Sequence, residues 1–209
     1  MGTDIHGVWQ KKDGEKWTDI PSNYEQGRHY QLFAVLAGVR NGFGFAGCVT
    51  GKAVTPISEP KGLPDDFLMD GDDHPVVSAD IFDPCRSQWY DPKSDDLSVW
   101  MGDHSHTWLS GQEMLSWYEK ENATIRSGVI DREQFYKWDG TSSPDSWCGG
   151  VSGANVVMAD SDDVSRKDWT HIRVSWVENL NESLAYFFDE VYRLVNEHDE
   201  IRFVFGFDS

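Results

Sequence analysis

The alternation of apolar and polar positions predicts that this chain opens with a β-hairpin and continues into a buried helix. Residues 3–10 alternate loosely, and the dipeptide Asp13-Gly14 that follows is typical of a tight turn, so residues 17–20 are expected to form the return strand. Residues 30–39 are apolar on nearly every side and reach a glycine near their end, which indicates a short buried helix.

Two helix starts are predicted further along the chain. Ser110 is followed three residues later by Glu113, which is the spacing of a capping box, where each side chain bonds the other residue's backbone amide. A second helix is expected to begin after Asp131.

The last third of the chain carries the clearest periodicities. Residues 170–177 alternate as a strand, residues 183–197 place apolar side chains at helical spacing, and residues 201–207 alternate again. An amphipathic helix between two strands is expected to pack one face on a sheet. The fold class predicted from these patterns is α+β, with a single sheet that includes the N- and C-terminal strands and is packed by amphipathic helices.

The middle of the chain follows neither period. Residues 65–96 offer few periodic apolar positions and many carboxylates, so we expect a long, irregular and exposed acidic insertion. No repeat or linker separates it from the rest, and we expect one α+β domain over residues 1–209.

Composition narrows the class of protein. Of the 209 residues 39% are hydrophobic and ten are tryptophan, which favours a globular chain. No apolar run approaches the roughly 20 residues that cross a bilayer. The opening residues include Asp4 and His6 where a signal peptide would carry basic and then apolar residues. We therefore expect no membrane association and a cytoplasmic location.

Charge and cysteine content add two further expectations. A net charge of −18 argues against direct nucleic acid binding and is compatible with a partner protein that has a basic surface. The three cysteines, Cys48, Cys85 and Cys148, lie far apart in the sequence, so buried free thiols are expected rather than a disulfide framework.

One glycine-rich motif argues against a dinucleotide cofactor. Residues 42–47 match G-x-G-x-x-G, but a predicted helix precedes them and an extended stretch follows, which is the reverse of the order that places a helix N-terminus at a pyrophosphate. We therefore expect no nicotinamide or flavin cofactor.

Two pairs of residues are the candidates for metal binding or catalysis. Asp4 and His6 share one face of the predicted first strand, and His104 and His106 would share a face if their segment is extended. All four together supply nitrogen and oxygen ligands suited to a divalent metal such as Zn, Mn or Fe, and His104 and His106 are the catalytic candidates. A metal site, a metal-free ligand or catalytic site, and a purely structural role all remain open.

Polar residues at the two ends of the buried helix are candidates for ligand binding. Arg28 and Tyr30 stand at its start, where backbone amides favour an anion, and Arg40 and Asn41 stand at its far end. The alternative is that each arginine pairs with one of the many acidic residues.

Several stretches together resemble a family of uncharacterised proteins encoded by phages and prophages. They are MGTDIHG at the start, GRHYQLFAVLAGVRNG, PISEPKGLPDD, GDHSHTWL and the closing IRFVFGFDS. The chain departs from the family pattern at Thr3, where members often carry cysteine, and at Lys61, where arginine is expected. The resemblance implies an accessory protein acting in the cytoplasm of an infected bacterial host.

Two functions are compatible with these features. The first is binding or hydrolysis of a small anionic, nucleotide-like ligand at a His/Asp-lined site, with or without a metal. The second is an acidic, aromatic-rich inhibitor without enzymatic activity that binds a host defence protein or a nucleic-acid-binding protein.

Overall fold

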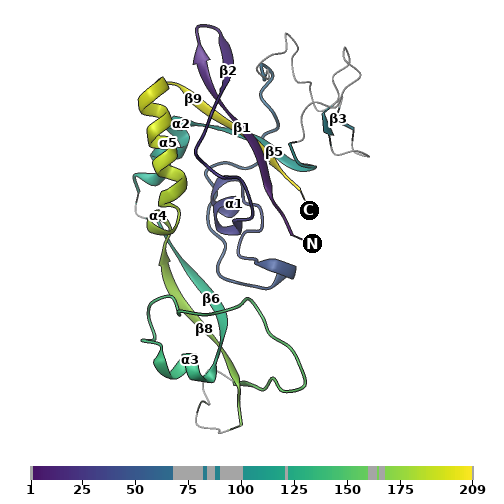
Figure 1. The fold of residues 1–209 in the computed structure, drawn as a ribbon, viewed down its shortest axis with the longest axis vertical. Helices are drawn as coiled ribbons and strands as arrows, with labels where there is room; N and C mark the ends of the chain where they lie inside the picture. The colour runs from purple at the N-terminus through teal and green to yellow at the C-terminus, as the bar shows by residue number, and fades with distance from the viewer. Residues whose placement is uncertain are drawn as a thin grey trace.

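The computed structural model describes residues 2–67, 82–83, 88–89, 101–120, 122–159, 164 and 168–208. The α+β class is confirmed. Figure 1 shows an elongated molecule, with the terminal strands and the helices that pack on them in its upper part and a second sheet with the helix over residues 132–137 in its lower part.

The first sheet contains the strands from both ends of the sequence. Its order is β2-β1-β9-β5, and every neighbouring pair is antiparallel. The strands are β1 (Ile5–Asp13), β2 (Lys16–Ile20), β5 (His104–Ser110) and β9 (Ile201–Phe207). The predicted hairpin and the pairing of the terminal strands are confirmed.

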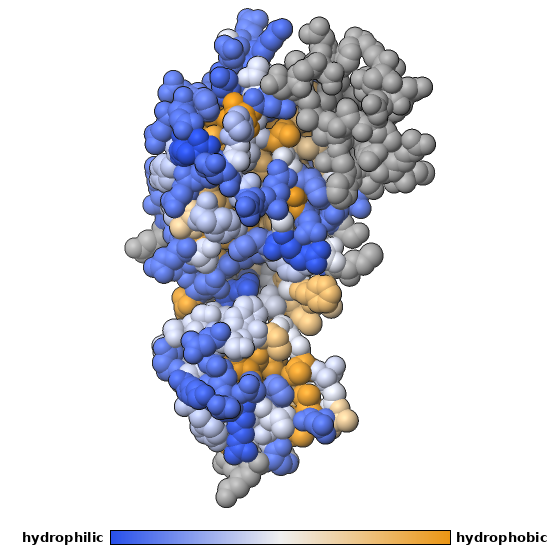
Figure 2. All heavy atoms as spheres, viewed as in Figure 1, coloured by the Kyte–Doolittle hydropathy of each residue, from blue (hydrophilic) through white to orange (hydrophobic). Residues whose placement is uncertain are grey.

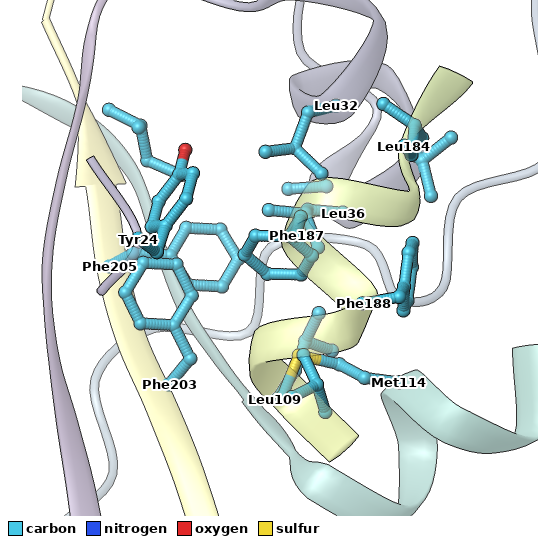
Figure 3. Close-up of a cluster of buried hydrophobic side chains, with 14 of the residues drawn as sticks. Tyr24, Leu32, Leu36, Leu109, Met114, Leu184, Phe187, Phe188, Phe203 and Phe205 are labelled. Carbon is cyan, nitrogen blue, oxygen red and sulfur yellow. The ribbon is translucent and has the colours of Figure 1, made fainter. Parts of the chain in front are cut away.

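One face of this sheet carries the main hydrophobic core. The alternation predicted for the last strand directs Phe203, Phe205 and Phe207 into this core, where all three are fully buried. Figure 3 shows Phe203 and Phe205 facing side chains of the helices, among them Leu36 and Phe187. The helices that contribute to this core are α1 (Tyr30–Ala37), α2 (Gly111–Tyr118), the short α4 (Leu180–Ser183) and α5 (Ala185–His198).

The helix ends follow the local sequence. Gly38 ends α1 in the left-handed conformation, with φ of 70°, which costs a glycine little. Ser110 and Glu113 form the predicted capping box of α2. The predicted helix over 183–197 is divided in two, a short α4 (Leu180–Ser183) and then α5.

The opposite face of the first sheet carries a smaller core and a buried cation. Phe67 and Met101 pack on Val204 there. Arg202, only 2% exposed, bonds the Asp66 carboxylate at 2.6 Å and the Gln10 side chain at 2.9 Å. These contacts attach the start of the acidic segment to the sheet.

A second sheet was not expected from the sequence. Its order is β6-β8-β7, with β6 (Ala123–Asp131), β7 (Met158–Ala159) and β8 (His171–Asn179). Ile172, Val174 and Trp176 share its buried face, as the alternation predicted, and α3 (Arg132–Lys137) starts at Asp131. The idea of a single sheet is therefore corrected, because β8 pairs with β6 and not with the terminal strands.

The expected acidic insertion falls mostly outside the described residues. Within 65–96 the structure describes residues 65–67 and two short paired strands, β3 (Phe82–Asp83) and β4 (Gln88–Trp89). Among the described residues, no helix is both long and apolar enough to cross a membrane.

Candidate functional site

The two predicted His/Asp pairs lie at the same end of the first sheet. His6 on β1 is aligned with Gly206, and His104 on β5 is aligned with Phe207, so β9 alone separates the pairs. The sheet therefore brings together residues that stand about a hundred positions apart in sequence.

A bulge in β5 prevents His104 and His106 from sharing a face. The register shifts between His104 and Thr107, and Ser105 has a positive φ of 53°. The His104 ring lies 6.1 Å from the ring of Phe207, whereas His106 lies over Gly206, where an added Cβ would be 2.6 Å from its ring. The expected same-face arrangement of these two histidines is therefore wrong.

Asp4 and His6 are each held by a charged or polar neighbour. Arg28 donates two hydrogen bonds to the Asp4 carboxylate, at 2.8 and 3.2 Å. The Nε2 atom of His6 is 3.3 Å from Asp208, whose other carboxylate oxygen accepts the Asp4 backbone amide. Asp208 is a member of this cluster that the sequence analysis did not select.

The remaining contacts of the histidines are local. His106 Nε2 lies 3.2 Å from the Gly102 carbonyl, and burial lowers the pKa of His106 against the opposing effect of that acceptor. His104 Nδ1 lies 2.9 Å from the Ser105 hydroxyl. The described residues contain no group of three or more His, Cys, Asp or Glu side chains arranged to hold a metal ion. Catalysis by these histidines stays a prediction.

The predicted ligand-binding residues divide into two groups. Arg28 and Tyr30 line a pocket, and the Arg40 guanidinium lies 5.6 Å from the centre of the Tyr30 ring while bonding Thr3 at 2.9 Å. The Asn41 amide instead forms two hydrogen bonds with the backbone of Val54, which is a structural role in the loop after α1.

The pocket lies between the start of α1, the loop that follows α1 and the β6 edge of the second sheet. Its volume is about 680 Å³. The loop, drawn in blue in Figure 1, runs from α1 to the second sheet, where Gly51 bridges to Arg126. The lining residues on the helix side are Arg28, His29, Tyr30 and Gln31, and those on the sheet side include Arg126, Trp147, Cys148, Gly149 and Gly150.

The charge of this pocket is opposite to that of the whole chain. Two arginines line it, and its described lining contains no carboxylate side chain, in a protein of net charge −18. Arg126 is only 18% exposed, and its guanidinium lies 5.3 Å from the centre of the Trp147 ring. Burial lowers the pKa of Arg126, while Glu178 at 3.1 Å favours the charged form.

Two polar atoms in the pocket lining lack a protein partner. The Tyr30 hydroxyl and the Gln31 side-chain nitrogen are buried, and neither forms a hydrogen bond with any described residue. A buried polar group left unpaired costs roughly 1–3 kcal/mol.

His29 connects the pocket to the helix start. Its Nδ1 atom accepts the Leu32 amide at 3.3 Å and so caps α1. Burial lowers the pKa of His29, and the nearby Arg126 cation adds to this effect. Neutral His29 is therefore the form that caps the helix.

The loop after α1 adds apolar side chains to the pocket and to the surface beside it. Phe43 and Phe45, which line the pocket, are 47% and 64% exposed, and the neighbouring Val49 is 53% exposed. Figure 2 shows further hydrophobic side chains on the visible face of the part that contains β6, β8 and α3, whereas the visible face around α5 is mostly hydrophilic. Cys148 is exposed and Cys48 is partly buried, so the expectation of buried thiols is wrong for Cys148.

A larger cleft, of about 970 Å³, lies between α2, residues 52–57 and the ends of β6 and β8. Its charges are mixed, because Lys52 and Lys120 share the lining with Glu113. It gathers none of the predicted site residues, and Glu113 is already engaged in the capping box. We therefore take the smaller, cationic pocket as the candidate site.

Comparisons with protein-family models, curated proteins and solved structures give no match for this chain.

Proposed function

We propose that this protein binds a small anionic ligand with an aromatic ring, a nucleotide being the simplest example, in the pocket between α1 and the second sheet. The observation that carries the proposal is a pocket with two arginines and no carboxylate among its described lining residues, in a strongly acidic chain. Arginine suits phosphate because its planar fork donates two parallel hydrogen bonds.

The aromatic walls support a ring in the ligand. Trp147 already stacks with the Arg126 guanidinium, and Phe43 and Phe45 stand exposed at the pocket mouth. Ring stacking on such side chains contributes roughly 1–3 kcal/mol per base in single-strand binders. A nucleotide would place its phosphate near Arg28 and Arg126 and its base against these rings.

Binding, rather than hydrolysis, is proposed for the pocket. Its described lining supplies cations, an amide, hydroxyls and thiols but no carboxylate, and its imidazole, that of His29, is engaged in capping α1. Arg28 joins the pocket to the His/Asp cluster through its pairing with Asp4, so a ligand phosphate would lie one side chain away from that cluster. A role in an infected bacterial cytoplasm is proposed on the family resemblance alone.

Calorimetric titration of the protein with adenosine 5′-monophosphate, adenosine and inorganic phosphate tests the proposal. We expect adenosine 5′-monophosphate to bind more tightly than adenosine or inorganic phosphate, because adenosine contacts only the aromatic side of the pocket and phosphate only the arginine side. Arg126→Gln should weaken nucleotide binding by about tenfold or more, as expected for the loss of a charged hydrogen bond of roughly 1.5–3 kcal/mol.

Arg132 offers a matched control outside the pocket. Its guanidinium lies 5.3 Å from the centre of the Trp169 ring, the same distance as in the pair of Arg126 and Trp147. Arg132→Gln should leave the affinity unchanged. The proposal is wrong if adenosine 5′-monophosphate fails to bind, or if both substitutions weaken its binding equally.

A second function is favoured by the exposed apolar loop. Phe43, Phe45 and Val49 form a projecting surface of the kind that anchors a protein partner, which agrees with the alternative of an inhibitor of a host protein. Val49→Ser, which changes the exposed loop but no lining residue of the pocket, should then abolish capture of that partner while the protein still binds adenosine 5′-monophosphate. Loss of nucleotide binding without loss of partner capture would instead leave the loop as a wall of the pocket.

A further inference from the structure

Cys48 and Cys148 belong to two chain segments attached to the same edge of β6. Ser127 donates its amide to the Thr50 carbonyl at 2.9 Å, two residues after Cys48. Cys148 exchanges two backbone hydrogen bonds with Val129, at 2.7 and 3.0 Å. The two segments therefore meet end to end over residues 127–129, although about a hundred positions separate them in sequence.

The thiols approach the same pair of glycines. An ideal Cβ placed on Gly149 would lie 3.0 Å from the Cys48 Cβ, and one placed on Gly150 would lie 3.3 Å from the Cys48 sulfur. The Cys148 thiol donates to the Gly150 carbonyl at 3.4 Å. Both sulfurs thus reach Gly150, and the missing glycine side chains leave space between them.

Arg173 holds the two segments together. Its guanidinium donates to the Val49 carbonyl at 3.1 Å and to the Gly149 carbonyl at 2.8 Å. Each acceptor belongs to the residue directly after one of the cysteines. The backbone on either side is therefore fixed, while Cys48 is partly buried and Cys148 is exposed.

We propose that Cys48 and Cys148 form a reversible disulfide that regulates the pocket. Glutathione disulfide is the oxidant. The thiolate of one cysteine attacks it, which releases one glutathione and leaves a mixed disulfide; the second thiolate then displaces the other glutathione. Two protein thiols lose two protons and two electrons in total, and one glutathione disulfide becomes two glutathiones. Disulfides of this transient kind are those expected in a reducing cytoplasm.

The effect on ligand binding rests on the proposed function. Both cysteines line the pocket, one on the loop after α1 and the other on the segment beside β6. A bond between them would fix the two sulfurs beside Gly149 and Gly150 in the pocket wall, where they would take up space next to Arg126 and Trp147. The oxidised protein should bind adenosine 5′-monophosphate roughly tenfold more weakly than the reduced protein, because the bridge would restrict the space that the ligand needs.

Oxidation of the Cys85→Ser variant tests the disulfide without the third cysteine. In a glutathione redox buffer, mass spectrometry should show loss of two hydrogens, and peptide mapping should show Cys48 linked to Cys148. In Cys85→Ser/Cys148→Ser, Cys48 should stop at the mixed disulfide, because its resolving thiol is gone. The Cys85→Ser variant unfolded in urea should favour the internal disulfide over the mixed disulfide roughly tenfold less than the folded variant does. The fold raises the effective concentration of one thiol at the other, and unfolding removes this effect.

Two results would overturn the proposal. If the folded protein forms only mixed disulfides, or favours the internal bond no more than the unfolded chain does, the cysteines are not a pair. If the disulfide forms and the nucleotide affinity does not change, regulation of the pocket is wrong. Failure of the reduced protein to bind any nucleotide would reject the proposed function, and mass spectrometry would still decide whether the thiols pair.

Discussion

The guanidinium of Arg126 lies 5.3 Å from the centre of the Trp147 ring, in a pocket that carries no carboxylate among its described lining residues. The contact orients a buried cation toward the pocket and leaves Glu178 to balance its charge from the neighbouring strand. This geometry depends on the flat shape of the guanidinium as well as on its charge.

The substitution Arg126→Lys tests whether the flat shape of the Arg126 guanidinium contributes to nucleotide binding in addition to its charge. The lysine keeps a cation near Glu178 but loses the planar stacking and the paired donors, so we expect nucleotide affinity to fall by about tenfold in calorimetric titration. Arg132→Lys, which alters an equally spaced pair with Trp169 outside the pocket, should leave the affinity unchanged. Equal affinities of Arg126→Lys and the unmodified protein would show that the stacked guanidinium contributes nothing to the ligand site.

Gly206→Ala should destabilise the sheet end that holds the His/Asp cluster. The added Cβ would lie 2.2 Å from the Met101 carbonyl and 2.6 Å from the His106 ring. Overpacking of this kind costs roughly 1–3 kcal/mol, measured by urea denaturation. Gly27→Ala, where an added Cβ meets nothing within 4 Å, is the control and should change the free energy of unfolding by less than about 0.5 kcal/mol.

The substitution Ser110→Ala should show how much the capping box contributes to the free energy of unfolding. The Ser110 hydroxyl accepts the Glu113 amide at 3.2 Å, and the Glu113 carboxylate accepts the Ser110 amide at 2.7 Å. Removal of the hydroxyl should lower the free energy of unfolding by about 1 kcal/mol. Ser116→Ala, on the exposed side of the same helix, should be neutral or slightly stabilising, since alanine has the higher helix propensity. Equal effects at both positions would mean that the cap contributes little.

Glu190→Gln should reduce stability in a pH-dependent way. Glu190 is buried, with its carboxylate bonded to Arg193 at 2.7 and 2.8 Å and to the Asn23 amide at 2.6 Å, and the bonds from Arg193 lower its pKa to about 2. Because the folded pKa lies below the ordinary value of 4.5, the carboxylate stabilises the fold fully above about pH 4.5, and this contribution is lost as the pH falls toward 2.

Denaturation at several pH values measures this effect. We expect Glu190→Gln to cost roughly 1–3 kcal/mol at pH 7 and progressively less between pH 4.5 and 2. Glu133→Gln is the control, because its ion pair with Lys137 is exposed and contributes little at any pH. A pH-independent difference between Glu190→Gln and the unmodified protein would contradict the linkage.

Most helices and strands could be predicted from signals within a few residues of sequence. Most of those that could not be predicted depend on pairing between distant segments of the chain. The capping box at Ser110 and the glycine that ends α1 are encoded within a few residues, so both could be predicted. β6 was missed, although Ile125 and Val129 hint at alternation, because Ser127 and Gly128 weaken its apolar pattern. The second sheet follows from the pairing of β6 with β8, which no short stretch of sequence specifies.

The candidate site could be predicted only in part for the same reason. Arg28 and Tyr30 were selected from their place at a helix start, and both line the pocket. Arg126 and Trp147 come from other segments and carry no local motif. The alternation rule also fails at Ser105, where a positive φ and a bulge separate His104 from His106. A bulge depends on the partner strand and is not visible in periodicity.

The central position of β9 has a consequence for how the protein folds. Both β1 and β5 bond to β9 and not to each other, so this sheet cannot assemble until the last strand in the sequence has joined the first. Contacts between such distant segments form only after a very long loop has closed, and the entropy lost in closing it slows folding. During synthesis the apolar face of the β1–β2 hairpin would stay exposed to solvent until residues 201–207 leave the ribosome and pair with β1.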